Sequence, residues 1–408
     1  MYRRVFARAV PAVFRFPFFR AVGRFERDGP TRQAIMALSD ARPPVPPARS
    51  GRLIEIDFFR GIVLLMIVVD HIGGSMISKI TLHSYALCDA AEVFVFLGGF
   101  AAASAFVAMS ERHGADVARR RFLRRAVQIY RAFLATTTLM LVVSAVLDHF
   151  GIESPNLALD DVSVMLATPL TGLVEVLTFQ RQPYLASVLP MYVLFALATP
   201  AIVPLARRWP AWLFAGSLAS WLASRWLGAE LLDTPSFKWS FNPFAWQLMF
   251  VLGALVRCRP VYRSLAARPG GAVLTGIALG VVAVCAYYKL FSGLPLPEGL
   301  LKRDLAWSRV VSFLAIAWLM ADLMRLGWVG KLARVVQPVV AVGQRGLVCY
   351  VVGTAISLTL DSLLHRAALS PHFSPIGIGF AADAIALGCL LTLASSGGWW
   401  QRLRRVPA

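Results

Sequence analysis

Long apolar segments recur along the chain from residue 58 to residue 396, and short polar or basic stretches separate them. A segment of about 20 apolar residues is long enough to cross the hydrocarbon core of a bilayer as an α-helix. We expect ten such helices, over residues 58–78, 87–109, 126–147, 184–206, 209–228, 243–258, 271–291, 306–325, 344–364 and 376–396. The pattern therefore predicts an all-α, polytopic integral membrane protein with about ten transmembrane helices.

The two ends of the chain depart from this pattern. Residues 1–52 are basic and proline-rich, which predicts a cytoplasmic segment that is largely disordered or lies on the membrane surface. Residues 53–400 form the predicted membrane domain, and residues 401–408 form a basic cytoplasmic tail. Residues 148–183 contain an apolar stretch that predicts an additional helix in the outer interface of the membrane.

Composition and charge support a membrane location. Hydrophobic residues make up 58% of the chain, charged residues only 15%, and the mean hydropathy is +0.64, which excludes a chain made only of soluble domains. Most of the 41 lysines and arginines fall on the side of the predicted topology that holds both termini, so the positive-inside rule places both termini in the cytoplasm. The net charge of +19 then reflects topology and contact with membrane lipids, and no nucleic-acid partner is expected.

The first predicted helix carries four ionisable residues: Asp57, Arg60, Asp70 and His71. Arg60 and His71 are eleven residues apart, so they lie on one helix face, offset by about 20° and separated by about 16 Å. Asp57 lies within about 60° of both. Such a stripe must face the protein interior or a wet cavity rather than lipid. Asp57 could instead cap the helix and Arg60 could reach the lipid headgroups, but His71 lies too deep for either role.

The second predicted helix begins with Asp89 and Glu92, one turn apart. If the first two helices are antiparallel neighbours, Glu92 lies at the level of His71, where it could orient the imidazole or raise its pKa. Asp70 points about 100° away from His71 and requires a different neighbour. The small residues that follow, from Gly98 to Ala105, predict close packing of this helix against another.

Two arginines stand out at the start of the third predicted helix. Arg124 and Arg131 are seven residues apart and share a helix face. They are interpreted either as determinants of topology or as a phosphate-binding patch, because guanidinium groups bind phosphate in a bidentate manner.

Several other residues have two interpretations. Trp246, Tyr184 and Tyr192 lie near helix starts on the outer side, where they could belong to the aromatic belt or stack on a sugar. Asp383 lies in the middle of the tenth predicted helix and requires a buried partner that the sequence does not identify. The five cysteines lack the spacing of metal ligands, so no metal site is expected.

The motifs "DFFRG", "DHI" and "DAAEVFVFLGGF" between Arg52 and Phe100 resemble the OpgC family of bacterial membrane proteins, which is associated with succinylation of osmoregulated periplasmic glucans. The spacing of Arg60 and His71 is similar to the signature of the wider type-3 acyltransferase superfamily. The stretches "QPYLASVLPMY" and "FNPFAWQLMFVLG" extend the resemblance to about residue 360. Gly98 departs from the family pattern, which has serine there.

The resemblance implies a membrane O-acyltransferase in the bacterial inner membrane. An acyl-CoA, either succinyl-CoA or acetyl-CoA, would be a co-substrate from the cytoplasm, with its phosphates held by Arg124 and Arg131. The acceptor would be a hydroxyl of a periplasmic glucan or another glycan. His71 would act as general base, Asp70 or Glu92 would stabilise its imidazolium, and Arg60 would hold the donor or polarise the acyl carbonyl.

Two other functions remain open from the sequence. A polytopic secondary transporter would also have ionisable residues near the membrane midplane, although here they cluster in the first two helices and the two halves of the chain do not mirror each other. A heparan-type membrane sugar acetyltransferase would have a similar motif in its first helix.

Overall fold

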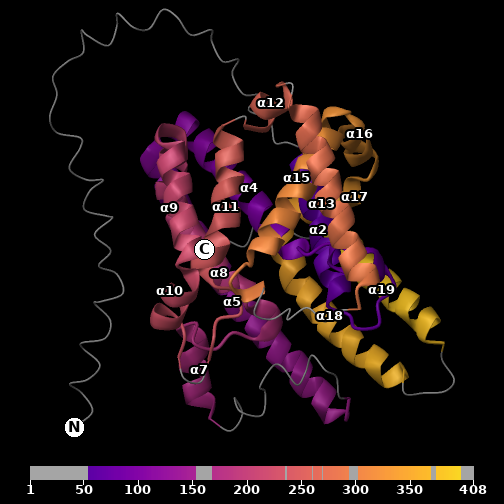
Figure 1. The fold of residues 1–408 in the computed structure, drawn as a ribbon. Helices are drawn as coiled ribbons and strands as arrows, with labels where there is room; N and C mark the ends of the chain where they lie inside the picture. Colours follow the sequence, from indigo (N-terminus) through magenta and orange to yellow (C-terminus); the bar gives the residue numbers. More distant parts are fainter. Residues whose placement is uncertain are drawn as a thin grey trace, which may run out of the picture. The chain divides into compact units, whose positions relative to one another are not determined.

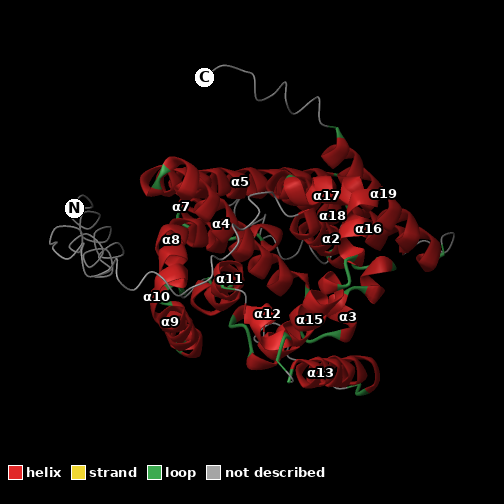
Figure 2. Ribbon diagram, turned by 90° about the horizontal axis from the view of Figure 1, so that it is seen from above, coloured by secondary structure: helices red, strands yellow, loops and turns green. Residues whose placement is uncertain are grey.

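The computed structural model describes residues 54–152, 168–234, 237–259, 261–268, 270–293, 302–368 and 374–396. Throughout these ranges the ordered elements are helices and no strand is present, which confirms the predicted all-α class (Figures 1 and 2). The basic segment of residues 1–52 and the tail of residues 401–408 lie outside the described residues.

Among the described residues, seven helices are long and apolar enough to cross a membrane. They are α4 (Ala90–His113), α5 (Ala115–His149), α8 (Val188–Arg208) with the short η4 (Tyr184–Ala186) before it, α13 (Gly271–Phe291), α15 (Trp307–Arg325), α18 (Gly346–Ala368) and α19 (Pro375–Ser395). The other three predicted spans correspond to shorter helices, namely α2 (Ile54–Asp70), α11 (Pro243–Cys258), and the pair α9 (Pro210–Leu222) and α10 (Ser224–Leu231). The chain is thus a multi-pass membrane protein, whereas ten crossings and cytoplasmic termini stay predictions.

Two predicted boundaries differ from the structure in ways that matter for function. The first span was expected to reach residue 78, but α2 ends at Asp70, and His71 begins a loop that leads through η2 (Ile77–Ile80) and α3 (Leu82–Tyr85) to α4. The third helix begins at Ala115 instead of residue 126 and has 35 residues. At 1.5 Å per residue it is about 52 Å long, well over the ~30 Å hydrocarbon core, so its arginine-rich first turns have room to extend beyond it.

Helix α2 packs against α4, α18 and α19, and also against the shorter α16 (Trp328–Val335) and α17 (Gln337–Gln344). Its contact with α17 requires Gly61, because a Cβ there would lie 2.0 Å from the carbonyl oxygen of Val339. The predicted small-residue contact of the second span is with α11, since a Cβ on Gly99 would lie 2.0 Å from the carbonyl oxygen of Phe250. These close contacts place α2 in the interior of the helical assembly.

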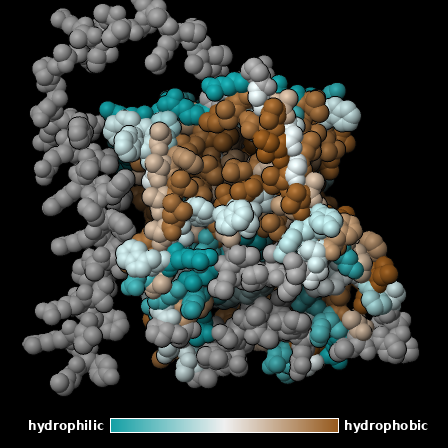
Figure 3. Space-filling view, viewed as in Figure 1, coloured by the Kyte–Doolittle hydropathy of each residue, from teal (hydrophilic) through white to brown (hydrophobic). Residues whose placement is uncertain are grey.

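The outer helices present apolar side chains to their surroundings. On α13, Val273, Ile277 and Val284 are exposed, as a helix in contact with lipid requires. Figure 3 shows apolar side chains across the middle of one face of the molecule, with a hollow among them and a hydrophilic edge above, near α12 (Val261–Ala266). The short α7 (Pro169–Leu177) lies within the segment predicted to form an interfacial helix; part of that segment, residues 153–167, lies outside the described residues.

Candidate functional site

His71 is the first residue after α2, and its ring is held at two points. Its Nδ1 lies 2.5 Å from the carbonyl oxygen of Ile67, and its ring packs edge-on against Tyr184, with 5.7 Å between the ring centroids. A carbonyl oxygen can only accept a hydrogen bond, so Nδ1 carries the proton and Nε2 is the basic nitrogen of the neutral ring. This is the tautomer that a general base requires.

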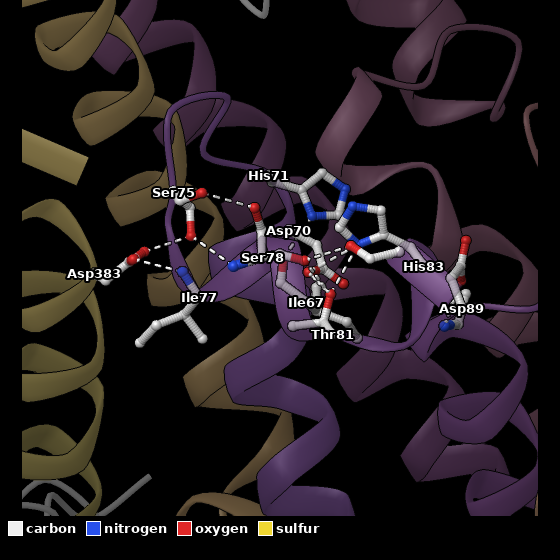
Figure 4. A network of polar contacts seen from close by, with 12 residues as sticks. Ile67, Asp70, His71, Ser75, Ile77, Ser78, Thr81, His83, Asp89 and Asp383 are labelled. Carbon is white, nitrogen blue, oxygen red and sulfur yellow. Dashed lines mark hydrogen bonds and ion pairs between the residues drawn. The ribbon is translucent and has the colours of Figure 1, made fainter. Parts of the chain in front are cut away.

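The loop after His71 is held by two buried aspartates from distant helices, of which Figure 4 shows Asp383. Asp361 of α18 accepts a hydrogen bond from the backbone N–H of Gly73 at 2.7 Å. Asp383 of α19, only 1% exposed, accepts from the hydroxyl of Ser75 at 2.5 Å and from two backbone N–H groups, those of Met76 and Ile77, at 2.9 Å each. The buried partner that the sequence requires for Asp383 is therefore the loop that follows His71.

Asp70 turns toward a second histidine. Its Oδ1 accepts a hydrogen bond from the hydroxyl of Thr81 at 2.6 Å and lies 3.2 Å from Nδ1 of His83. The hydrogen bond to Asp70 raises the pKa of His83 above its usual value of 6.5. The hydrogen-bonding partners of the Asp70 carboxylate are thus Thr81 and His83, consistent with the expectation that Asp70 points away from His71.

Asp89 and Glu92 belong to a buried cluster of charged groups. Asp89 caps α4 by accepting from the N–H of Ala91, while Glu92 accepts from the N–H of Asp89. Arg309 of α15 binds both carboxylates, Glu92 at 2.5 Å and Asp89 at 2.9 Å, and Lys302 binds Asp89 at 2.9 Å. Burial alone would raise the pKa of Asp89, but Lys302 and Arg309 hold it well below its usual range. The hydrogen bonds of Glu92 lie within this cluster, which ties α4 to α15.

A small pocket opens beside His71. It is lined by residues of α2, of α18 and of the segment before α8, namely Leu64, Ile67, Val68, His71, Leu185, Tyr350, Thr354 and Ser357. Its volume of about 20 Å³ has room for a water molecule. Leu64, Ile67 and His71 follow Arg60 at four, seven and eleven residues, so the pocket lies on the stripe that joins Arg60 to His71.

The other end of the stripe is arranged around Arg60. Its guanidinium lies 3.9 Å from the carboxylate of Asp57, which is 4% exposed and sits in the first turn of α2. A Cβ on Gly346 would lie 3.1 Å from the Arg60 guanidinium, so α18 passes close to it. The contacts of Arg60 thus come from α2 itself and from α18.

Arg124 and Arg131 lie elsewhere on α5. Both are exposed, on the face of the helix roughly opposite its buried residues, such as Phe133. The structure thus separates the two predicted phosphate ligands from the stripe on α2.

The three aromatic candidates, Trp246, Tyr192 and Tyr184, lie in different surroundings. Trp246 is fully buried, and its indole N–H donates to the carbonyl oxygens of Lys302 and Arg303. It therefore packs in the protein interior and holds this segment in place. Tyr192 lies against Phe94, and its buried hydroxyl has no hydrogen-bond partner in the described part of the chain. Tyr184 is 41% exposed and touches His71, so it is the aromatic residue placed to meet a ligand beside the imidazole.

Several site residues were missed in the sequence. Thr81 and His83 lie in the loop that begins at His71 and turn back to Asp70, whereas Asp361 reaches this loop from α18; no helical spacing signals these contacts. Arg309 had a signal, because an arginine three residues inside a predicted span requires buried acidic partners. In the described ranges, no group of three or more His, Cys, Asp or Glu side chains is placed to hold a metal ion.

Comparison with known proteins gives one result. Neither the curated proteins nor the solved structures contain a match to this chain. Residues 52–402 match the family model described as OpgC protein, which spans the whole described fold. The chain therefore belongs to the OpgC family, and this membership indicates a membrane acyltransferase-like function in the modification of glucans.

Proposed function

We propose that the protein transfers an acyl group, succinyl in the first instance, from a cytoplasmic acyl-CoA to a hydroxyl of a periplasmic glucan. The observation that carries this proposal is the stripe of α2, which has a correctly protonated imidazole beside a small pocket at one end and the guanidinium of Arg60 at the other. A base and an anion-binding cation on one buried helix face suit a reaction in which the two substrates approach from opposite sides of the membrane.

The donor would be held at the Arg60 end. The guanidinium of Arg60 offers paired N–H donors, which bind a phosphate in a bidentate manner. Since Arg60 lies about 16 Å from His71 along α2, it is suited to hold the phosphates of the donor and not to polarise the acyl carbonyl. Arg124 and Arg131, on the exposed face, would attract the anionic donor or anionic lipids to this side.

The acceptor would approach the His71 end, from the periplasm. Tyr184 is exposed beside His71 and offers an aromatic face on which a sugar ring could stack. Nε2 of His71 takes the proton of the acceptor hydroxyl as its oxygen attacks the thioester carbonyl. The new C–O bond forms, the C–S bond breaks, and the sulfur leaves with the bonding electron pair. Asp361 and Asp383 act on this chemistry only by holding the loop that begins at His71.

The decisive experiment is mass spectrometry of periplasmic glycans from cells that lack the protein, from cells that express it, and from cells that express His71→Ala or the matched control His149→Ala. His149 is exposed at the far end of α5 and outside the site. We expect an ester-bound acyl group with the wild type and the control but not with His71→Ala. Wild-type acylation by a correctly inserted His71→Ala protein would refute the role of His71.

The same spectra distinguish the alternatives. A mass increase of an acetyl ester instead of a succinyl ester would assign the donor to acetyl-CoA, as in the heparan-type enzymes. An unchanged glycan mass together with altered distribution of the glycan across the membrane would favour a transporter.

A further inference from the structure

His71 is one of two histidines at this end of α2. His83, in the short helix α3, lies against the carboxylate of Asp70, the residue next to His71 in the chain. Figure 4 shows both histidines at this end of α2, with Asp70 and Thr81 in contact with His83. The charges of Asp70 and Asp89 act on both rings, which places the two histidines in one electrostatic environment.

The contacts of His83 define its tautomer. The hydroxyl of Thr81 has two partners that only accept, the carboxylate of Asp70 at 2.6 Å and the carbonyl oxygen of Ser78 at 2.9 Å, so it accepts from Nδ1 of His83, 2.8 Å away, and the same Nδ1 lies 3.2 Å from Asp70. Nδ1 of His83 therefore carries a proton that points at Thr81 and Asp70, and Nε2 is the basic nitrogen of the neutral ring. A carboxylate that orients an imidazole in this way is the arrangement found in catalytic acid–base pairs.

The two rings differ in their access to water. His71 lines the small pocket, whereas the side chain of His83 is 43% exposed. His83 is thus the more exposed of the two rings. We propose that the Asp70–His83 pair is a proton relay, which removes from His71 the proton taken from the acceptor hydroxyl and releases it to water. This inference rests on the proposed acyl transfer.

The chemistry of a thioester creates the need for such a relay. A thiol has a pKa of about 8.5, so the sulfur can leave as a thiolate without first receiving a proton. His71 then remains protonated and cannot accept the next proton. Nε2 of His83 takes this proton, directly or through one water, and passes it to the solvent, while the thiolate takes a proton from water on the donor side. One proton leaves the hydroxyl and one joins the sulfur, so the reaction is balanced.

The charged groups around His83 support a proton acceptor that works near neutral pH. Asp70 on α2 raises the pKa of His83 through its hydrogen bond, and Asp89 before α4 adds to this effect. Lys289 on α13 opposes it, and Lys79 on η2 is turned to the sulfur of Met76. A relay must be neutral to accept a proton, so turnover falls as the pH drops through the pKa of His83. Replacing Asp70 with asparagine removes the stabilising charge and moves this acidic limb to lower pH.

The experiment is a pH profile of acyl transfer by purified protein, with a glucan acceptor and acyl-CoA, for the wild type, His83→Ala, His83→Gln, Asp70→Asn and the control His149→Ala. Removing a positioned acid–base group lowers rates by about 10²–10⁴-fold, and because water can replace part of the relay we expect a loss of about tenfold or more in kcat for both His83 variants, with the acceptor KM unchanged. Added imidazole should restore part of the kcat of His83→Ala, because the position is open to water, and His149→Ala should match the wild type.

The outcomes separate the two proposals. A kcat of His83→Ala equal to that of the wild type, with the same acidic limb, overturns the relay and leaves the acyl transfer intact. A loss that occurs in His83→Ala but not in His83→Gln, and that imidazole does not restore, assigns His83 a structural role and also overturns the relay. Absence of transfer by the wild-type protein overturns the proposed function itself, and the relay with it.

Discussion

Asp383 provides a sharp test of how the fold positions the base. In Asp383→Ala, the loop after His71 loses three hydrogen bonds to a buried carboxylate, those from Ser75, Met76 and Ile77. Hydrogen bonds to charged groups contribute about 1.5–3 kcal/mol each, and partial replacement by water leaves a net loss of about 2–4 kcal/mol for this loop. The loop then samples other positions, and His71 loses its alignment with the substrates.

A misplacement of about 1 Å at a reacting group can lower the rate by about 10²-fold. We therefore expect kcat of acyl transfer to fall by about 10–100-fold in Asp383→Ala, with a smaller change in the KM of either substrate. Asp383→Asn keeps an oxygen that can accept from the two backbone N–H groups, so it should retain most of the activity. A control is Asp322→Ala, because the Asp322 carboxylate also accepts side-chain hydrogen bonds, from the hydroxyls of Tyr262 and Thr275, but in a different contact, between α12, α13 and α15.

The assay is the initial rate of ester formation per mole of folded protein, with folding checked by thermal unfolding in detergent. A kcat within twofold of the wild type for folded Asp383→Ala would show that the loop does not need this anchor to hold His71. A loss of equal size in Asp322→Ala would show that the effect is one of general stability.

Three further predictions concern stability and donor binding. Arg309→Met leaves Glu92 buried without its cation, and we expect thermal unfolding to show a loss of about 3–5 kcal/mol; an unchanged melting temperature would contradict this view of the cluster. Gly61→Ala places a methyl group against the carbonyl of Val339 and should destabilise the protein by about 1–3 kcal/mol, measured by thermal unfolding. An unchanged melting temperature would show that α17 shifts to make room for the methyl group at no cost. Arg60→Gln should raise the KM for acyl-CoA at least tenfold while the acceptor KM is unchanged, and an unaltered donor KM would remove Arg60 from the donor site.

The apolar segments predicted which parts of this chain form helices more reliably than they predicted where each helix ends. Apolar length located α11 and α13 to the residue, because lipid requires an unbroken apolar run. It placed His71 inside a helix, whereas α2 ends at Asp70 and the apolar residues that follow belong to a loop. Hydropathy does not distinguish these cases, because a loop buried by other helices can be as apolar as a span. The loop is stable here because Asp361 and Asp383 satisfy its backbone N–H groups.

The sequence by itself determined the all-helical membrane fold, the family, and the stripe that joins Arg60 to His71, since all of these depend on local spacing or on the apolar length of single segments. Only the tertiary structure decided the partners of the charged groups. Glu92 was expected to orient His71, but its hydrogen bonds go to Arg309 and the N–H of Asp89, and Asp70 binds Thr81 and His83. A buried charge takes whichever partner the packing of distant helices brings within hydrogen-bond distance, and one chain segment does not encode that choice.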